Sequence, residues 1–323
     1  MNYYLGIDGG GTKTKFTLCD ENGTFITSSI QPTCHYLQCG LQGVTSVFNK
    51  GLQDCLKKAF INKIEIAYIF AACAGYGDIE EDNPKIKQAV AKALDPIPFQ
   101  IGNDTENALA GSLAGNSGIN IIAGTGSIGM GLNEKGEVFR CGGWHHAFGG
   151  DEGSAFWLAS NLLRLFTRQS DGRDEKTLLY SYMKENMEWS YDSDVLKNCV
   201  IEWKYNRTKI ADLAKHVSIL ANQGDMHAIK LYENAAQEVG DIIETIYHKI
   251  KTNRIILVSY SGGVFNGGKF IIEPLKKRLN NINVTLIPPI LTPDKGGVLL
   301  AMKQAKVHIT PKIIANLKEE KPI

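Results

Sequence analysis

The sequence of 323 residues has almost no net charge and no long apolar run, and each absence excludes a class of protein. Lys and Arg total 35 against 34 Asp and Glu, which argues against a strongly basic nucleic-acid binder and against an acidic solvating tail. No stretch approaches the roughly 18 consecutive apolar residues of a membrane span, and the first residues lack a leader-like pattern. We therefore expect neither nucleic acid nor membrane among the partners.

Cysteine is also sparse: its seven copies are scattered and never spaced as Cys-x-x-Cys. This pattern argues against a disulfide framework and a structural zinc site, and it favours a reduced, cytoplasmic setting. Apolar residues make up 43% of the chain, which at this length predicts about two domains with sizeable cores. Glycine is abundant, with 33 residues concentrated in a few tight clusters.

The first third of the chain predicts three antiparallel strands followed by alternating helices and strands. Asn22-Gly23 marks a hairpin, because Asn-Gly is a strong short-range hairpin signal. The order is βββαβα, which is mixed rather than purely parallel. The predicted strands are 4–8, 12–19, 24–29, 64–71 and 98–101, and the predicted helices are 41–60, 85–94 and 105–114.

The same opening then recurs, which suggests two similar halves. A strand, a Gly/hydroxyl turn, a strand and an Asn133–Gly136 hairpin follow one another from residue 120. Residues 153–250 are mostly helical by periodicity, and the charged tail from Pro311 is expected to fray. The remaining predicted elements are strands 120–123, 128–132, 138–141, 255–258 and 284–287, and helices ending near 279 and spanning about 295–305.

The strongest functional signal is the run Asp8-Gly9-Gly10-Gly11-Thr12-Lys13-Thr14. A carboxylate ends one strand, three residues without a Cβ form a tight turn, and two hydroxyls and an ammonium follow. Backbone N–H groups of such a turn form a nest for phosphate oxygens, because no side chain blocks their approach. Asp8 suits a magnesium ion held through water. The alternative is an ordinary glycine hairpin with surface Thr and Lys.

Two further glycine turns have a similar character. Gly124-Thr125-Gly126-Ser127 supplies a second cradle for a nucleotide's phosphates, with a plain turn as the alternative. Ser261-Gly262-Gly263 follows a buried strand and exposes backbone that suits an adenine and ribose, or forms a tight strand-to-helix corner.

Two familiar nucleotide patterns do not apply. Gly124-x-Gly126-x-x-Gly129 fits the dinucleotide fingerprint, but the residues after it predict a strand where that fingerprint needs a helix. Gly263-x4-Gly268-Lys269 imitates a Walker A loop, but Phe270 stands where a Ser or Thr must reach the magnesium ion.

The three glycine turns occur in this order in the actin, sugar-kinase and heat-shock ATPase superfamily, which the chain resembles. More narrowly, it is similar to the N-acetylglucosamine kinase branch, shared with the activator ATPases of benzoyl-CoA reductase and hydroxyacyl-CoA dehydratases. The specific marks are Asp104 with the following helix, and Gly142-Gly143-Trp144 leading to Gly150-Asp151-Glu152-Gly153-Ser154. These motifs span about residues 6–301.

The resemblance implies an α/β fold of two ribonuclease-H-like (actin-like ATPase) domains, with mixed five-stranded sheets flanked by helices, closing over ATP and a sugar. The first domain would cover residues 1–115 and be completed by the C-terminal helix at about 293–310. The second would cover residues 116–292, with a helical insertion at about 154–250.

The resemblance also implies roles for individual residues. Asp8 would serve the magnesium ion, and Asp104 would be the catalytic base that takes the proton of the acceptor hydroxyl. The alternative for Asp104 is an N-cap of the helix at Thr105. Gly262 and Gly263 would lie beside the nucleoside. The phosphate contacts would come from Gly10, Gly11, Thr12, Lys13, Thr14, Gly124, Thr125, Gly126 and Ser127.

Five residues correspond to sugar-contacting positions: Cys34, His35, Asn103, Trp144 and Asp151. For Trp144 the alternative is a core aromatic. Cys34 departs from the related kinases, which usually carry an Asn there, and a thiol is a weak donor and a weak acceptor. Ile128 likewise stands where animal relatives carry Asn, and the loop from Trp144 to Asp151 is one residue longer. These departures bear on which sugar is bound more than on ATP binding.

We therefore expect an ATP- and Mg2+-dependent kinase of a small sugar, with N-acetylglucosamine, glucosamine and N-acetylmuramic acid as the amino sugars in view. A homodimer is one open option. The first alternative is an ATPase activator with an iron–sulfur cluster held by cysteines near the second phosphate turn, where this chain has only Cys141. The second alternative is a nucleotide-binding regulator whose sugar site no longer turns over.

Overall fold

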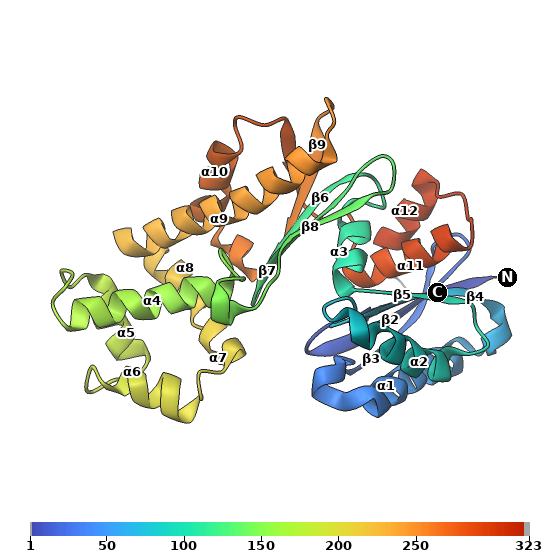
Figure 1. Cartoon of the computed structure of the whole chain (residues 1–323), viewed down its shortest axis with the longest axis horizontal. Helices are drawn as coiled ribbons and strands as arrows, with labels where there is room; N and C mark the ends of the chain where they lie inside the picture. The colour runs from blue at the N-terminus through green and yellow to red at the C-terminus, as the bar shows by residue number, and fades with distance from the viewer. Residues whose placement is uncertain (1, 320–323) are drawn as a thin grey trace. The chain divides into compact units, whose positions relative to one another are not determined.

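The computed structural model describes residues 2–319, which divide into two compact units. Unit 1 comprises the residues up to Ser117 and those from Pro289 onward, and unit 2 runs from Gly118 to Pro288. Each unit is built on one five-stranded sheet (Figure 1). Within the described range, no helix is long and apolar enough to cross a membrane.

The sheet of unit 1 has the strand order β3-β2-β1-β4-β5. The antiparallel meander of three strands that the sequence predicts is present, and two parallel strands extend it. Asp20 organises the hairpin between the second and third strands, because its Oδ1 accepts from the N–H groups of Asn22 and Thr24 at 2.9 and 2.8 Å. The strands are β1 (Tyr3–Gly9), β2 (Lys13–Asp20), β3 (Phe25–Pro32), β4 (Ile66–Cys73) and β5 (Phe99–Gly102).

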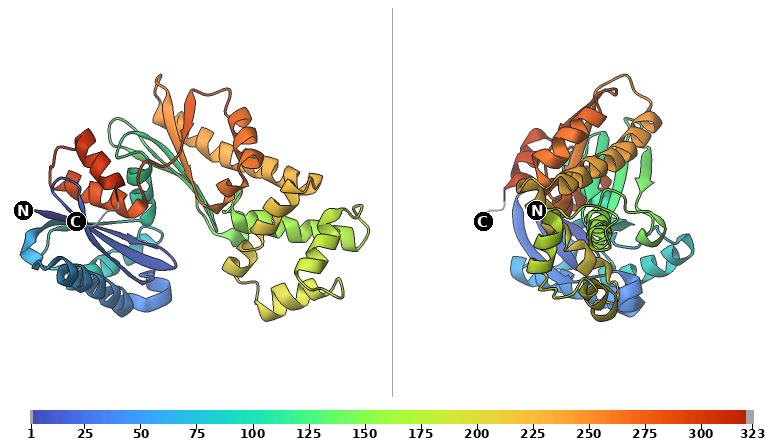
Figure 2. Two further views of the ribbon diagram at one scale, coloured as in Figure 1. Left: turned by 180° about the vertical axis from the view of Figure 1, so that it is seen from behind. Right: turned by 90° about the vertical axis from the view of Figure 1, so that its left-hand side faces the viewer.

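Helices cover both faces of this sheet (Figures 1 and 2). On one face, α1 (Tyr36–Ala59) packs over the strands that carry the fully buried Phe16 and Leu18, and α2 (Asn83–Leu94) lies against α1. On the other face, α3 (Asp104–Ser112) packs against α11 (Pro293–Gln304). Helix α1 begins five residues before the predicted start, because the positive φ of Gly40 (68°) breaks it only locally.

The expected fraying of the tail from Pro311 is wrong for the described part of it. Residues Pro311–Lys318 form the helix α12, with Thr310 as N-cap accepting from the Ile313 N–H at 3.3 Å. Ile313 and Leu317, one helical turn apart, are buried in the same core cluster as Tyr4 and Cys19 of the sheet. The segment forms a helix because these two side chains pack into the core. The charged residues around them made this apolar pattern hard to recognise in the sequence.

The sheet of unit 2 has the order β10-β9-β6-β7-β8 and repeats the pattern of three antiparallel strands extended by two parallel ones. The predicted α/β fold with two mixed five-stranded sheets is therefore confirmed. Asn133 organises the hairpin between β7 and β8 by accepting from the N–H groups of Lys135 and Glu137. The strands are β6 (Gly118–Ala123), β7 (Ser127–Leu132), β8 (Val138–Gly142), β9 (Ile256–Ser261) and β10 (Val284–Ile287).

The stretch between β8 and β9 is helical, as predicted. Its long last helix, α9, packs on β6, β7 and β8, and α10 lies alongside α9 (Figure 1). The helices of unit 2 are the 3-10 turn η3 (His146–Phe148), α4 (Ala155–Ser170), α5 (Leu178–Asn186), α6 (Asp194–Leu196), the π-helical η4 (Lys197–Glu202), α7 (Arg207–Ala211), α8 (Ala214–Asn222), α9 (Met226–Ile250), the 3-10 turn η5 (Gly263–Gly267) and α10 (Lys269–Arg278).

Candidate active site

The first glycine turn joins β1 to β2 and has its carbonyl groups engaged. Gly10 O accepts from Thr33 Oγ1 at 2.8 Å, and Gly11 O accepts from Gln38 Nε2 at 3.1 Å. Among the described residues, no hydrogen bond uses the N–H groups of Gly11 and Thr12. Two adjacent donors are thus open to a ligand, which is the property that a phosphate nest requires.

The side chains after this turn divide into two groups. Thr12 and Lys13 are exposed beside the open N–H groups. Thr14 is fully buried, and its Oγ1 donates to Pro32 O at 2.8 Å. Its hydroxyl therefore holds β2 to β3 rather than extending from the turn toward a ligand.

Asp8 lies near the carboxyl end of β1, one residue before the turn. Its Oδ1 accepts from Asn107 Nδ2 at 3.2 Å. Burial raises the pKa of Asp8 to about 7, and the charges of Asp104 and Asp294 act in the same direction, while Asn107 opposes them. A carboxylate held in this way gains from a nearby cation.

Asp294, in the first turn of α11, is a third acidic residue of this region. Its Oδ2 accepts from Thr17 Oγ1 at 2.6 Å and lies 3.0 Å from the Lys15 ammonium. Burial acts to raise the pKa of Asp294, but the contacts with Thr17 and Lys15 outweigh it, so the pKa lies below its usual value. In the described part of the chain, no three His, Cys, Asp or Glu side chains are grouped closely enough to hold a metal ion directly. The side chains therefore fit a magnesium ion held through water better than one bound by a dedicated ligand cage.

Asp104 is the first residue of α3, directly after β5 and Asn103. The alternative role of Asp104 as N-cap is wrong, because Asn103 Oδ1 caps the helix by accepting from the Thr105 N–H at 3.1 Å. Asn103 Nδ2 also donates to Tyr76 O at 2.8 Å, so the Asn103 side chain supports the loop after β4. Asp104 is half-buried and lies three residues before Asn107 in α3, whose side chain bonds to Asp8, so the two carboxylates lie in one neighbourhood.

Cys34 and His35 lie between β3 and α1, close to the first turn. Cys34 is fully buried, and a Cβ on Gly9 would collide with its Sγ. A hydrogen bond with Cys73 lowers the pKa of the Cys34 thiol. His35 caps α1, with Nδ1 accepting from the Leu37 N–H at 3.3 Å, and its ring stacks on Tyr36. The half-buried His35 is therefore nearer the surface than Cys34.

The second glycine turn joins β6 to β7 and is bonded to the start of α4. Gly124 O accepts from the Ala155 N–H at 2.8 Å, and Thr125 O accepts from the Phe156 N–H at 3.3 Å. Within the described residues, the N–H groups of Thr125 and Gly126 take part in no hydrogen bond. This turn thus repeats the arrangement of the first one: its carbonyls are engaged and two neighbouring N–H groups are open.

Ser127 and Asp151 are buried beneath this turn. Ser127 Oγ donates to Glu152 O at 2.6 Å, and Asp151 Oδ1 accepts from the Ser127 N–H at 3.3 Å. Asp151 Oδ2 pairs with Arg207 Nη2 at 2.5 Å. Both side chains therefore support the turn in this structure.

Trp144 is 73% exposed, so the core-aromatic alternative is wrong. The Arg140 guanidinium lies 5.8 Å from the centre of its ring. Its indole faces solvent in the loop between β8 and α4, where it is open to a flat apolar ligand face.

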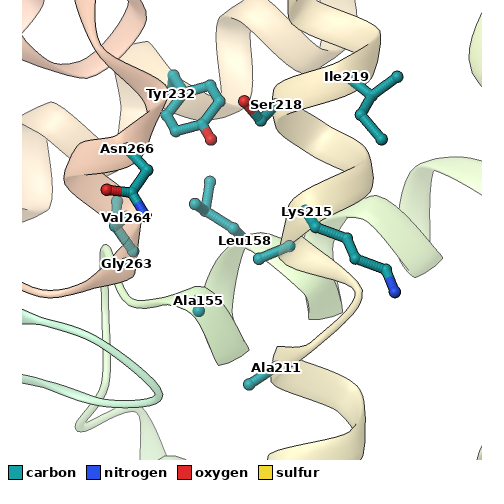
Figure 3. Close-up of a pocket in the computed structure, with 11 residues that line it drawn as sticks. Ala155, Leu158, Ala211, Lys215, Ser218, Ile219, Tyr232, Gly263, Val264 and Asn266 are labelled. Carbon is teal, nitrogen blue, oxygen red and sulfur yellow. The ribbon is translucent and has the colours of Figure 1, made fainter.

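The third glycine turn abuts the second one. A Cβ on Gly262 would collide with Ala123 O, and its φ of 105° also favours glycine. Gly263 next to it faces open space and borders a cavity of about 380 Å³ (Figure 3). Tyr232 and Ser218 lie together at one end of this cavity, while Lys215 turns its ammonium away. Its walls include Ala155, Ala211, Ser218, Tyr232, Gly263 and Asn266.

Each unit therefore gathers part of the predicted site. Unit 1 brings Asp8, the first turn, His35 and Asp104 together, whereas unit 2 joins the second turn, Asp151 and the cavity at Gly263. Sequence reasoning missed Asn107, Asp294, Lys15 and Arg207, whose partners are remote in sequence. The Asp294–Thr17 bond spans 277 positions and the Arg207–Asp151 bond 56, so no local spacing signals them.

The sheets and their glycine turns define an actin-like ATPase fold. The chain belongs to the BadF/BadG/BcrA/BcrD ATPase family, whose model matches residues 5–301. The resemblance to this family and to its N-acetylglucosamine kinase-like branch is thereby confirmed.

Several characterised relatives are distant amino-sugar kinases. An N-acetyl-D-glucosamine kinase of Dictyostelium discoideum is 28% identical, with 94% of this chain and 98% of that protein covered. An N-acetylmuramic acid/N-acetylglucosamine kinase of Clostridium acetobutylicum is 27% identical over 87% of this chain and 91% of its own length. A glucosamine kinase of Vibrio cholerae is 22% identical over 77% and 82%.

Solved structures show the same fold at low identity. A Chromobacterium violaceum protein, provisionally named an N-acetylglucosamine kinase, superposes with a TM-score of 0.68 at 22% identity, covering 93% of this chain and 99% of its own. A ROK family glucokinase of Streptomyces griseus has a TM-score of 0.57 at 18% identity, covering 94% and 100%.

Proposed function

We propose that this chain is an ATP-dependent phosphotransferase that phosphorylates a hydroxyl of a small amino sugar, such as N-acetylglucosamine, glucosamine or N-acetylmuramic acid. The observation that carries the proposal is the combination in unit 1 of an open phosphate nest with two carboxylates. The N–H groups of Gly11 and Thr12 are open, and Asp8 and Asp104 stand in one neighbourhood beside them. The distant amino-sugar kinases support the choice of acceptor.

Asp104 is assigned the role of general base. Because Asn103 caps α3, the Asp104 carboxylate is not needed to start the helix. A carboxylate within hydrogen-bond reach of an acceptor hydroxyl takes its proton as the phosphoryl group is transferred. Phosphoryl transfer needs positioning and charge neutralisation more than covalent help, and the remaining residues are suited to both.

The nucleotide would be held by backbone more than by side chains. In unit 1 the open N–H groups of Gly11 and Thr12, with the side chains of Thr12 and Lys13, suit phosphate oxygens. In unit 2 the open N–H groups of Thr125 and Gly126 suit them as well. The cavity beside Gly263 has a volume in the range of small-molecule sites and suits the nucleoside. Asp8 would hold a magnesium ion through water, and the ion would neutralise phosphate charge.

The sugar side of the site differs from the pattern of the related kinases. Cys34 and Asp151 are buried, so His35, Asn103 and Trp144 are the members of that group that reach the surface. A site that lacks the amide of the related kinases discriminates differently among amino sugars. The proposal therefore extends to the class of amino sugars rather than to one of them.

The test is the release of ADP by the purified chain with Mg2+ and each of the three amino sugars, with glucose and water as controls. The expected result is sugar-dependent ADP release with at least one amino sugar and a phosphorylated sugar detected by mass spectrometry. Hydrolysis of ATP that no sugar stimulates, together with protein-bound iron and sulfide, would favour an activator ATPase instead. Binding of ATP without turnover would favour a regulator.

A further inference from the structure

The guanidinium of Arg207, in the helical insertion, lies at the second glycine turn. No sequence pattern predicts this position. Arg207 Nη2 lies 2.5 Å from Asp151 Oδ2. The Asp151 side chain is only 5% exposed, whereas that of Arg207 is 41% exposed. Both carboxylate oxygens of Asp151 have a partner: Oδ2 pairs with Arg207, and Oδ1 accepts from the Ser127 N–H. The guanidinium, in contrast, retains donors that no described residue uses, among them its buried Nε.

The guanidinium lies against the turn itself. A Cβ on Gly126 would collide with Arg207 Nη2 and with Asp151 Oδ1, so only glycine allows this approach. The open N–H groups of Thr125 and Gly126 belong to the same turn. Two backbone donors and an arginine therefore meet at one place, and this combination recognises phosphate oxygens.

Helix α7 connects this place to the cavity. Ala211 lines the cavity, and Arg207 lies four residues earlier, on the same face of the helix. Ala155 also lines the cavity, and its N–H bonds to Gly124 O of the turn. A ligand whose base occupies the cavity would thus have its phosphates directed toward Gly126 and Arg207.

We infer that Arg207 binds the phosphates of the nucleotide at the second glycine turn and makes the site prefer a nucleoside di- or triphosphate over a nucleoside. The inference rests on the proposed function, which assigns this turn to phosphate. Asp151 balances the charge of Arg207 in the absence of nucleotide and orients the guanidinium toward the turn. The Arg207–Asp151 pair has no net charge. Removing the charge of Arg207 therefore leaves a negative charge beside the phosphate, and removing the charge of Asp151 leaves a positive one.

The test compares the dissociation constants of adenosine and ADP by isothermal titration calorimetry, using the full chain with Mg2+ and no sugar. The measured quantity is the ratio of the adenosine constant to the ADP constant. Arg207→Gln leaves the Asp151 charge unbalanced and is expected to lower this ratio about tenfold. Asp151→Asn keeps an acceptor for the Ser127 N–H, leaves the guanidinium unneutralised, and is expected to raise the ratio about threefold.

Arg168→Gln is the matched control, because Arg168 makes a two-point ion pair with Asp174 in the same unit at 2.7 Å. It should leave the ratio unchanged. A purely structural role of Arg207 would weaken adenosine and ADP equally, and an unchanged ratio in Arg207→Gln overturns the inference. If that variant does not fold, an unchanged ratio in both Arg207→Lys and Asp151→Asn overturns it. Failure of sugar phosphorylation alongside a lowered ratio would overturn the proposed function and leave this inference intact.

Discussion

Asn107 of α3 donates its side-chain Nδ2 to Asp8 Oδ1 at 3.2 Å and to Ile7 O at 3.0 Å. Asn107 is fully buried, so these bonds join the interior of the helix to the strand end that carries the carboxylate. The same helix begins with Asp104. One packing contact between α3 and β1 therefore holds the Asp8 carboxylate against the helix that carries Asp104.

Replacing Asn107 with Leu should move the pH dependence of turnover. Loss of the donor raises the pKa of Asp8 further, because the hydrogen bond with Asn107 now opposes the effect of burial. Activity that needs ionised Asp8 is lost as the pH is lowered. The midpoint of this loss should lie about one pH unit higher than in the wild type, as measured by ADP release. Ser112→Ala, on the same helix, is the control and should leave the profile in place. An unchanged profile in Asn107→Leu would contradict the role of this bond.

Asp8→Asn should stabilise the ligand-free protein at alkaline pH. The pKa of Asp8 in the fold, about 7, lies above its ordinary value of 3.8. The contribution of protonated Asp8 to the free energy of unfolding is fully present below about pH 4. It is lost as the pH rises through 7, since the wild type then carries a buried charge. At pH 8.5 the variant should have a free energy of unfolding about 4 kcal/mol higher than the wild type, seen as a higher melting temperature, with little difference at pH 4. The exposed Glu81→Gln is the control, and a lower midpoint of Asp8→Asn at pH 8.5 would refute the assignment.

Asp104→Asn tests the base directly. Turnover should fall by about a thousandfold because the amide cannot accept the proton, while the dissociation constant of ADP changes by less than about threefold. Rapid-mixing measurement of product formation gives the first quantity and calorimetry the second. Asp104→Glu retains a carboxylate and should keep more activity than the amide variant. Full activity of Asp104→Asn would show that another group accepts the proton.

Cys34→Asn should not provide a contact with the sugar, although it introduces the Asn that the related kinases usually carry. Cys34 is fully buried and packs against Gly9, so a larger polar side chain has no room there. The variant should lose about 2 kcal/mol of unfolding free energy, without a lower KM for N-acetylglucosamine. Cys34→Ala is the control for lost packing alone. A stable variant with a lower KM would mean that this position reaches the sugar.

Leu317→Ala tests the packing of α12. Leu317 is 1% exposed, and its truncation should lower the free energy of unfolding of unit 1 by about 3 kcal/mol, seen as a lower denaturation midpoint. Ile314→Ala, at a half-buried position three residues earlier, should cost less. Equal midpoints for Leu317→Ala and the wild type would mean that the helix is dispensable.

The succession of strands and helices along the chain and the glycine turns were predictable because their signals are local. Alternating burial, Asn-Gly hairpins and runs of glycine act over a few residues, and each unit repeats them. The capping of α3 was misjudged by one residue, since Asn103 and Asp104 are both good caps and only the bond from Thr105 distinguishes them. The helix after Pro311 was missed because its charged residues mask the two apolar ones that pack.

The sequence by itself located the glycine turns and the acids at the strand ends, because these depend on backbone freedom and on strand geometry. The class of the fold followed from the resemblance of these motifs to a known family. The tertiary structure alone decided which polar groups remain available. It buries Thr14 and Cys34, turns Trp144 outward, and brings Asn107 to Asp8 and Arg207 to Gly126. Such pairings arise from the packing of elements that are distant along the chain, so no local pattern of residues encodes them.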